Sequence, residues 1–168
     1  MNKYTKIAAC IALPVYGLVC GSSAFALTAS DTVPVTATVI DSCTVNATAI
    51  TFGNYNGIAG SALDSVGTVT AVCTMGTAFS VALDAGTGAG AALTARKLTG
   101  PAGATLAYGI FCDAPRTQVW GDGSGGTDVA SGTGSGSAQS FTMYGRVPSL
   151  QTSTVGSYTD NVTVTLTY

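Results

Sequence analysis

Residues 106–112 read LAYGIFC, and every second position in this stretch, Leu106, Tyr108, Ile110 and Cys112, carries an apolar side chain. Such alternation is typical of a half-buried β-strand. The same pattern recurs at Val33, Val35, Ala37 and Val39; at Val69, Ala71 and Cys73; at Phe79, Val81 and Leu83; at Phe141 and Met143; and at Val162, Val164, Leu166 and Tyr168. Turn-forming residues separate these sets, at 52–54, 84–86, 99–101 and 155–157. Because no helical period follows residue 26, the sequence predicts an all-β fold, an antiparallel β-sandwich.

The chain carries very few charges. Charged residues make up 8% of it, against about a quarter in ordinary soluble domains. Beyond residue 26 there are eight Asp, four Lys or Arg, and no His or Glu, which leaves a formal net charge of −4. No basic surface for nucleic acid can be drawn from this set, so we expect no nucleic-acid partner. A surface with so few charges is also poorly protected against self-association.

The first 26 residues predict a secretory signal peptide. Lys3 and Lys6 give a basic start, residues 7–20 are mostly apolar, and Ala24-Phe25-Ala26 forms a small-x-small cleavage site. The apolar run is shorter than the roughly 20 residues that a membrane-spanning helix needs. We therefore expect export, with residues 27–168 forming one domain.

Three of the five cysteines lie beyond the signal peptide: Cys43, Cys73 and Cys112. An exported chain meets oxidising conditions. Of the three pairings, Cys43 with Cys73 is favoured, because Cys43 closes the first predicted strand and Cys73 ends a later one, so that a bond between them staples the first strand to the sandwich. Cys112 is then a free thiol, either buried and inert on the core-facing side or joined to another molecule.

Three further segments have distinct patterns. Residues 121–136 are rich in Gly, Ser and Thr, and this composition predicts a mobile loop. Residues 158–168 are predicted to form one terminal strand. At the other end, residues 27–40 are extended and alternating, but they precede Cys43 and so are not held by the disulfide. They would leave an unpaired, aggregation-prone strand edge unless they pair with another molecule's sheet.

The sequence gives little support for ligand chemistry. Gly121, Gly123 and Gly126 match GxGxxG, but no helix follows to bind a phosphate, so we expect no nucleotide cofactor. Asp122 and Asp128 flank this loop, yet two carboxylates are few ligands for Ca²⁺, and a solvated loop is the favoured interpretation. A thiol metal site is disfavoured because there is no His and no CxxC pair.

Catalysis is equally poorly supported. Without His there is no Ser-His-Asp arrangement. Asp84, Asp113 and Asp160 lie at predicted strand ends or turns, where Asp accepts backbone hydrogen bonds without any further function. Trp120 is interpreted as a packing residue rather than as a stacking platform for a ligand. We therefore predict that the protein is not an enzyme and has no catalytic, cofactor-binding or metal-binding residues.

Residues 106–117 (LAYGIFCDAPRT) and 119–123 (VWGDG) resemble the central signature of spore coat protein U domain proteins, a family that includes the subunits of archaic chaperone-usher pili. The resemblance extends from residues 37–39 (ATV), 43–45 (CTV) and 52–55 (FGNY) to residues 156–160 (GSYTD) and 162–164 (VTV), and so covers essentially all of residues 27–168. It implies an incomplete immunoglobulin-like sandwich that lacks its last strand and is completed by a donor strand from a neighbouring subunit.

The resemblance also implies partners and roles for particular residues. A periplasmic chaperone would hold the subunit, an outer-membrane usher would receive it, and other copies of the chain or related pilins would then bind it. Residues 27–40 would be the N-terminal extension, with Val33, Val35, Ala37 and Val39 as the donor strand. The acceptor groove and chaperone contact would be formed by Val162, Val164, Leu166 and Tyr168. Two residues depart from this pattern: Pro34, which cannot donate a ladder hydrogen bond, and Cys112.

These observations predict a structural subunit of a surface pilus or fimbria, exported through the periplasm and serving adhesion to an abiotic or host surface and biofilm formation. The alternative is a self-contained secreted β-sandwich, a binding module or coat protein that does not polymerise. The two differ in whether the sandwich is complete.

Overall fold

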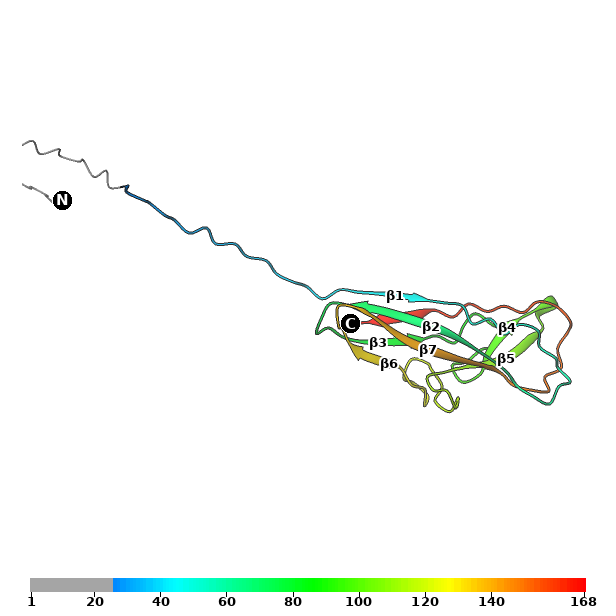
Figure 1. The fold of residues 1–168 in the computed structure, drawn as a ribbon. Helices are drawn as coiled ribbons and strands as arrows, with labels where there is room; N and C mark the ends of the chain where they lie inside the picture. Colours follow the sequence, from blue (N-terminus) through cyan, green and yellow to red (C-terminus); the bar gives the residue numbers. More distant parts are fainter. Residues whose placement is uncertain (1–25) are drawn as a thin grey trace, which may run out of the picture. The chain divides into compact units, whose positions relative to one another are not determined.

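The protein is described by a computed structural model that covers residues 26–168 (Figure 1). The predicted signal peptide therefore lies almost entirely outside the described residues. Residues up to Ala37 and residues Thr38–Tyr168 are two separate units, and the second contains every strand. The strands are β1 (Cys43–Ala47), β2 (Leu63–Cys73), β3 (Ala78–Leu83), β4 (Arg96–Thr99), β5 (Thr105–Phe111), β6 (Ala130–Thr133), β7 (Ala138–Val147) and β8 (Val164–Thr167), with one 3₁₀ turn, η1 (Pro101–Gly103).

The strands form two antiparallel sheets, as the alternation predicted. The larger sheet has the order β1-β2-β7-β5-β4 and the smaller one the order β6-β3-β8. Their inward faces supply a common core, which includes Val69, Ala71, Phe79, Val81, Leu83, Leu106, Tyr108, Ile110, Met143 and Val147. Most of these residues were identified from the sequence, because period-two alternation and one-sided burial coincide along β2, β3 and β5.

The predicted disulfide is present between Cys43 and Cys73, which lie directly opposite each other in the β1–β2 ladder. One detail of the prediction was wrong, because Cys43 opens the first strand and does not close it. Residues 26–42 contain no strand, and the alternating residues 33–39 are exposed. The alternation at residues 33–39 therefore does not correspond to a strand among the described residues.

Residues 121–136 are not a single loop, contrary to the prediction. They contain β6, which pairs with β3 from Ala78↔Thr133 to Val81↔Ala130. Glycine makes this close pairing feasible: a Cβ atom at Gly132 would lie 2.9 Å from the Phe79 ring, and one at Gly134 would collide with the backbone of Thr74. The small residues that resemble a flexible linker thus allow a strand to lie directly on an aromatic core residue.

The predicted terminal strand over residues 158–168 was also too long, since only Val164–Thr167 is a strand. Thr159 instead pairs with Thr99 at the edge of the larger sheet, while Thr163 pairs with Asp84 next to the smaller sheet. The segment therefore crosses from one sheet to the other, and its backbone cannot continue a single ladder. Figure 1 shows this crossing in the red C-terminal part of the chain.

A buried arginine lies between the sheets, which the sequence did not predict. Arg96 is completely buried and donates to the backbone carbonyls of four residues, Leu83, Asp84, Leu93 and Trp120. Burial lowers its pKa, and the carbonyl dipoles replace the water that solvates the guanidinium elsewhere. Trp120 is a packing residue, as predicted: it is 1% exposed and its indole N–H donates to the Val81 carbonyl.

Candidate strand-acceptor groove

An open groove runs between the segment that follows β1 and the segment that precedes β8. A cavity of about 320 Å³ lies between the segment that follows β1 and the segment that precedes β8, and a second of about 930 Å³ continues it along residues 50–57 and 151–160. Ile50, Phe52, Leu98 and Asp160 line both, so the two cavities are parts of one groove. Core residues of both sheets form its floor near β8, among them Leu83, Ile110 and Met143.

The backbone of β8 leaves half of its hydrogen-bonding groups facing the groove. Asp84 N–H donates to the Thr163 carbonyl, and the ladder continues in register from Leu83↔Val164 to Ser80↔Thr167. Since alternate residues of a strand face opposite neighbours, the N–H and C=O of residues 163, 165 and 167 face β3. Those of Val162, Val164 and Leu166 therefore face the open edge.

The backbone of β1 presents a second edge to the same gap. Thr74 N–H donates to the Ser42 carbonyl and Thr48 N–H to the Thr68 carbonyl, so the even-numbered residues face β2. The N–H and C=O of Cys43, Val45 and Ala47 then face away from the sheet. Cα atoms of β1 and β8 approach within 8 Å of each other, and Figure 1 shows the cyan and red strands next to each other. At Ala47 and Val164 the groove thus adjoins two strand edges that have no partner among the described residues.

Beyond Ala47 the chain leaves the edge of the sheet and turns inward. Glycines at inward positions of β2 and β7 make room for it. A Cβ atom at Gly67 would lie 2.9 Å from Ile50, and one at Gly145 would lie 2.8 Å from Ile50 and 2.9 Å from Phe52. This wall of the groove is therefore made of side chains that fill the space above two glycines, rather than of a regular strand.

A polar cluster around Asp160 lies where the two cavities meet. Asp160 accepts hydrogen bonds from the Thr87 backbone (2.7 Å) and hydroxyl (2.9 Å) and from the Tyr108 hydroxyl (2.7 Å). Burial, and then the bond to Asp160, raises the pKa of Tyr108 well above its usual range. Asp160 thus fixes the C-terminal segment to the core at the point where it crosses between the sheets.

Only some of the residues predicted to form the acceptor groove line it. Val162 and Val164 line the groove, Leu166 packs against the core beside it, and Tyr168 is 60% exposed. The predicted donor residues Val33, Val35 and Val39 are 84%, 89% and 83% exposed. Sequence reasoning did not identify Ile50 or Leu98 as groove residues. It noted Phe52 and Asp160 only as turn residues and as parts of the family signature.

The polar residues singled out in the sequence serve the fold. Asp122 accepts a hydrogen bond from the Ser124 backbone, and Asp84 accepts from Gly86 and Thr163. Within residues 26–168, no three His, Cys, Asp or Glu side chains are grouped so as to hold a metal ion. Over the same residues, no helix has the length and apolarity to cross a membrane. Cys112 is a half-buried free thiol, and its pKa is raised to about 11, chiefly by burial.

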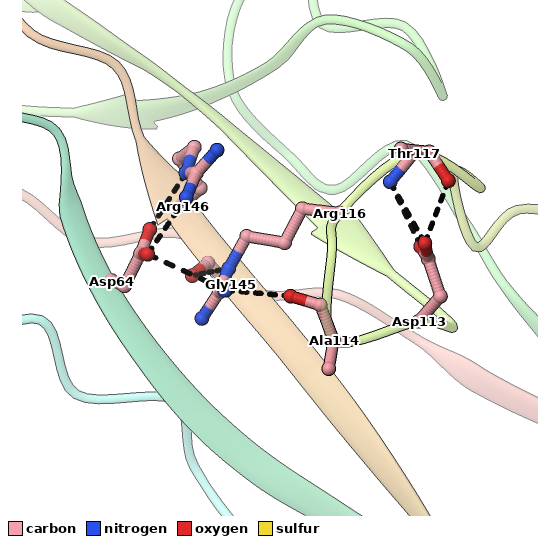
Figure 2. A network of polar contacts seen from close by, with 7 residues as sticks. All are labelled: Asp64, Asp113, Ala114, Arg116, Thr117, Gly145 and Arg146. Carbon is pink, nitrogen blue, oxygen red and sulfur yellow. Dashed lines mark hydrogen bonds and ion pairs between the residues drawn. The ribbon is translucent and has the colours of Figure 1, made fainter.

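The signature residues 113–117 form a loop fastened to the outer face of the larger sheet (Figure 2). Asp113 accepts hydrogen bonds from the backbone and hydroxyl of Thr117. Arg116, at a φ of 62°, donates to the Gly145 carbonyl and lies 3.4 Å from Asp64, which also pairs with Arg146 at 2.7 Å. The Asp64 pKa is lowered, above all by the hydrogen bond from Arg146. These contacts tie the loop after β5 to β2 and β7, so the signature has a structural role.

Comparisons with known proteins agree with this architecture. A comparison with curated protein sequences gave no match. Among solved structures, the chain is similar to a chain of the CsuC–CsuE chaperone-tip adhesion subunit pre-assembly complex from the archaic chaperone-usher Csu pili of Acinetobacter baumannii, with a TM-score of 0.57 and 20% identity. The match covers 78% of this chain and 41% of that one, and it shows a shared immunoglobulin-like fold. The family model of the Spore Coat Protein U domain matches residues 29–165, and the chain therefore belongs to this family.

Proposed function

We propose that this protein is a non-catalytic structural subunit of a chaperone-usher type pilus, which polymerises when residues 27–40 of one copy enter the groove of another. One observation carries the proposal. Near Ala47 and Val164 the groove has a mostly apolar lining and adjoins two strand edges that are unpaired among the described residues, and the same chain has an exposed segment with apolar side chains at every second residue. An added strand satisfies both, because its backbone pairs with an edge and its alternate side chains fill the groove.

Two favourable contributions and one cost determine the free energy of this assembly. Full burial of a valine side chain stabilises by about 1.5 to 3 kcal/mol, and Val33, Val35 and Val39 are all more than four-fifths exposed beforehand. Each new backbone hydrogen bond contributes about 1 kcal/mol. Ordering the extended segment opposes these gains, at about 1 to 2 kcal/mol per residue. Side-chain burial in the groove therefore decides whether the assembly forms.

The proposal extends to the partners and the location of the subunit. Before assembly its edges need temporary cover, and a periplasmic chaperone would supply it; the similar chain named above belongs to a chaperone–subunit complex. An outer-membrane usher would then pass the subunit to the cell surface. There the fimbria would serve adhesion to an abiotic or host surface and biofilm formation.

The test is non-reducing, unboiled SDS gel electrophoresis of surface material from the native host. The wild type is compared with a variant in which Val33, Val35 and Val39 are replaced by Ser. The matched control replaces Thr32, Thr36 and Thr38 by Ser and so alters the other face of the same segment. We expect a ladder of multimers in the wild type and the control, and its loss in the valine variant. Folded monomer in all three would instead support a self-contained secreted module.

A further inference from the structure

The strand β8 has few contacts of its own with the rest of the sandwich. Among the described residues it pairs with β3 alone, over four residue pairs. The buried core side chains of residues 26–168 come from β2, β3, β5 and β7 and from Trp120, and none comes from β8. A short strand at the end of a chain, with a neighbour on one side, opens easily unless other contacts hold it. The groove wall that includes Val164 therefore depends on contacts outside the ladder.

Two aspartates tie the start of β8 to the turn that follows β3. Asp84 accepts a hydrogen bond from the Thr163 backbone N–H at 2.9 Å, and its own N–H donates to the Thr163 carbonyl at 3.1 Å. In the other direction, Asp160 accepts from the backbone N–H and the hydroxyl of Thr87. Each segment thus supplies a carboxylate to the backbone of the other. We call Asp84, Thr87, Asp160 and Thr163 the carboxylate clamp.

Both carboxylate residues of the clamp are fixed to the core. The Arg96 Nε atom donates to the Asp84 carbonyl at 2.9 Å, and this arginine, the first residue of β4, is completely buried. The Tyr108 hydroxyl on β5 donates to Asp160 at 2.7 Å. Gly86 allows the turn to pass close by, since its φ is 80° and a Cβ atom there would collide with the Asp160 carboxylate. The position of the clamp is therefore set by β4 and β5.

The bonds of the clamp are of the strong kind. Burial raises the pKa of Asp84, but the hydrogen bonds from Thr163 and Gly86 outweigh it, so that the pKa lies below its usual value. The carboxylate is therefore ionised at neutral pH, and hydrogen bonds to an ionised acceptor are stronger than neutral ones. The bonds between Asp84 and Thr163 lie on the β3 side of β8, so a strand that enters the groove from the open side does not displace them.

We propose that the carboxylate clamp holds β8 in place, that β8 opens separately from the rest of the sandwich when the clamp is lost, and that Asp84 and Asp160 are thereby positioning residues for the groove. The clamp keeps Val162 and Val164 at the groove while no strand fills it. The link to assembly rests on the proposed function, whereas the local opening of β8 does not.

Hydrogen–deuterium exchange tests the clamp in the full chain. Every change is made in the valine variant described above, so that strand exchange between copies does not protect β8. We expect Asp84→Ala and Asp160→Ala to raise the exchange rate of the β8 amides about tenfold, the effect of one lost charge-assisted hydrogen bond, and to leave the β5 amides unchanged. The matched control is Asp122→Ala, because Asp122 accepts a hydrogen bond from the Ser124 backbone in a different loop.

Milder variants of the same residues separate the hydrogen bonds from the bulk of the side chain. Asp84→Asn and Asp160→Asn keep a side-chain carbonyl oxygen as acceptor, and we expect their β8 amides to exchange within about threefold of the parent rate. Thr87→Val removes the clamp's hydroxyl group and keeps its backbone N–H, so it should raise the exchange rate of the β8 amides by less than Asp160→Ala does.

In the wild-type background, the two alanine variants should also lose the SDS-resistant ladder, and Asp122→Ala should keep it. Equal acceleration of the β5 and β8 amides, unchanged exchange in β8, or no rescue by asparagine would overturn the inference. An intact ladder in the alanine variants would overturn the role of the clamp in assembly. Faster exchange in β8 combined with a wild type that forms no ladder would support the clamp and overturn the proposed function.

Discussion

The bond between Cys43 and Cys73 closes a loop of sequence separation 30 and fastens the edge strand β1, one wall of the groove, to β2. In the chain-entropy model a loop of this length stabilises the fold by about 3.6 kcal/mol. We expect the double variant Cys43→Ser, Cys73→Ser to lose that amount. With a urea dependence of about 2 kcal/mol per molar, the unfolding midpoint falls by about 2 M.

The assay uses the single tryptophan of the chain. Trp120 is 1% exposed and packs in the core, so its fluorescence reports the unfolding of the sandwich. All variants are compared in a chain that begins at Thr38, the first residue of the compact unit, so that strand exchange does not alter the transition. Cys112→Ser is the control, and its free energy of unfolding is expected to change by no more than about 0.5 kcal/mol. A larger loss in this control than in the double variant would refute both the pairing and the reasoning.

Three further predictions concern single positions. Gly145→Ala pushes a methyl group against Ile50 and Phe52 and should lower the free energy of unfolding by about 1 to 3 kcal/mol in the fluorescence assay. The control is Gly60→Ala, whose methyl group would point into open space, and it should change the free energy of unfolding by less than about 0.5 kcal/mol. Arg96→Met leaves four carbonyls without a donor and should cost about 3 to 5 kcal/mol, whereas little change would show that water replaces the guanidinium. Because the pKa of Cys112 is raised to about 11, its reaction with a thiol reagent at pH 8 should be slow and should accelerate tenfold per pH unit up to pH 10; a plateau near pH 9 would contradict this.

The sequence predicted the parts of the fold in which neighbouring residues carry the information. Val69 and Ala71 on β2, and Tyr108 and Ile110 on β5, are buried at alternate positions because each strand has one face on the core. The disulfide pairing was also predicted, although part of the reason was wrong: the strand expected before Cys43 is absent, and Cys43 instead opens β1 opposite Cys73. The apolar alternation in the sequence therefore matches the buried positions in the structure on strands such as β2 and β5, which have a neighbouring strand on both sides.

The groove was only partly predictable, because distant residues determine its walls. Ile50 and Phe52 show no alternation, and their places depend on Gly145, more than ninety positions later in the chain. The crossing at residues 158–163 depends on partners such as Thr99 and Tyr108, which a scan for strands cannot see. Val162 and Val164 were found because the chain returns to a regular extended form there.

The edges of the sheets differ in a way that supports assembly through the groove. Proteins usually protect exposed strand edges with charges, prolines or covering segments. The β4 edge has such protection: it contains Arg96 and Lys97, and Thr159 pairs with its last residue, Thr99. Neither β1 (CTVNA) nor β8 (VTLT) contains a charge or a proline. The β6 edge (ASGT) of the smaller sheet also has neither a charge nor a proline. The β1 and β8 edges are distinguished by their position, because they are the two that a strand entering the groove would approach.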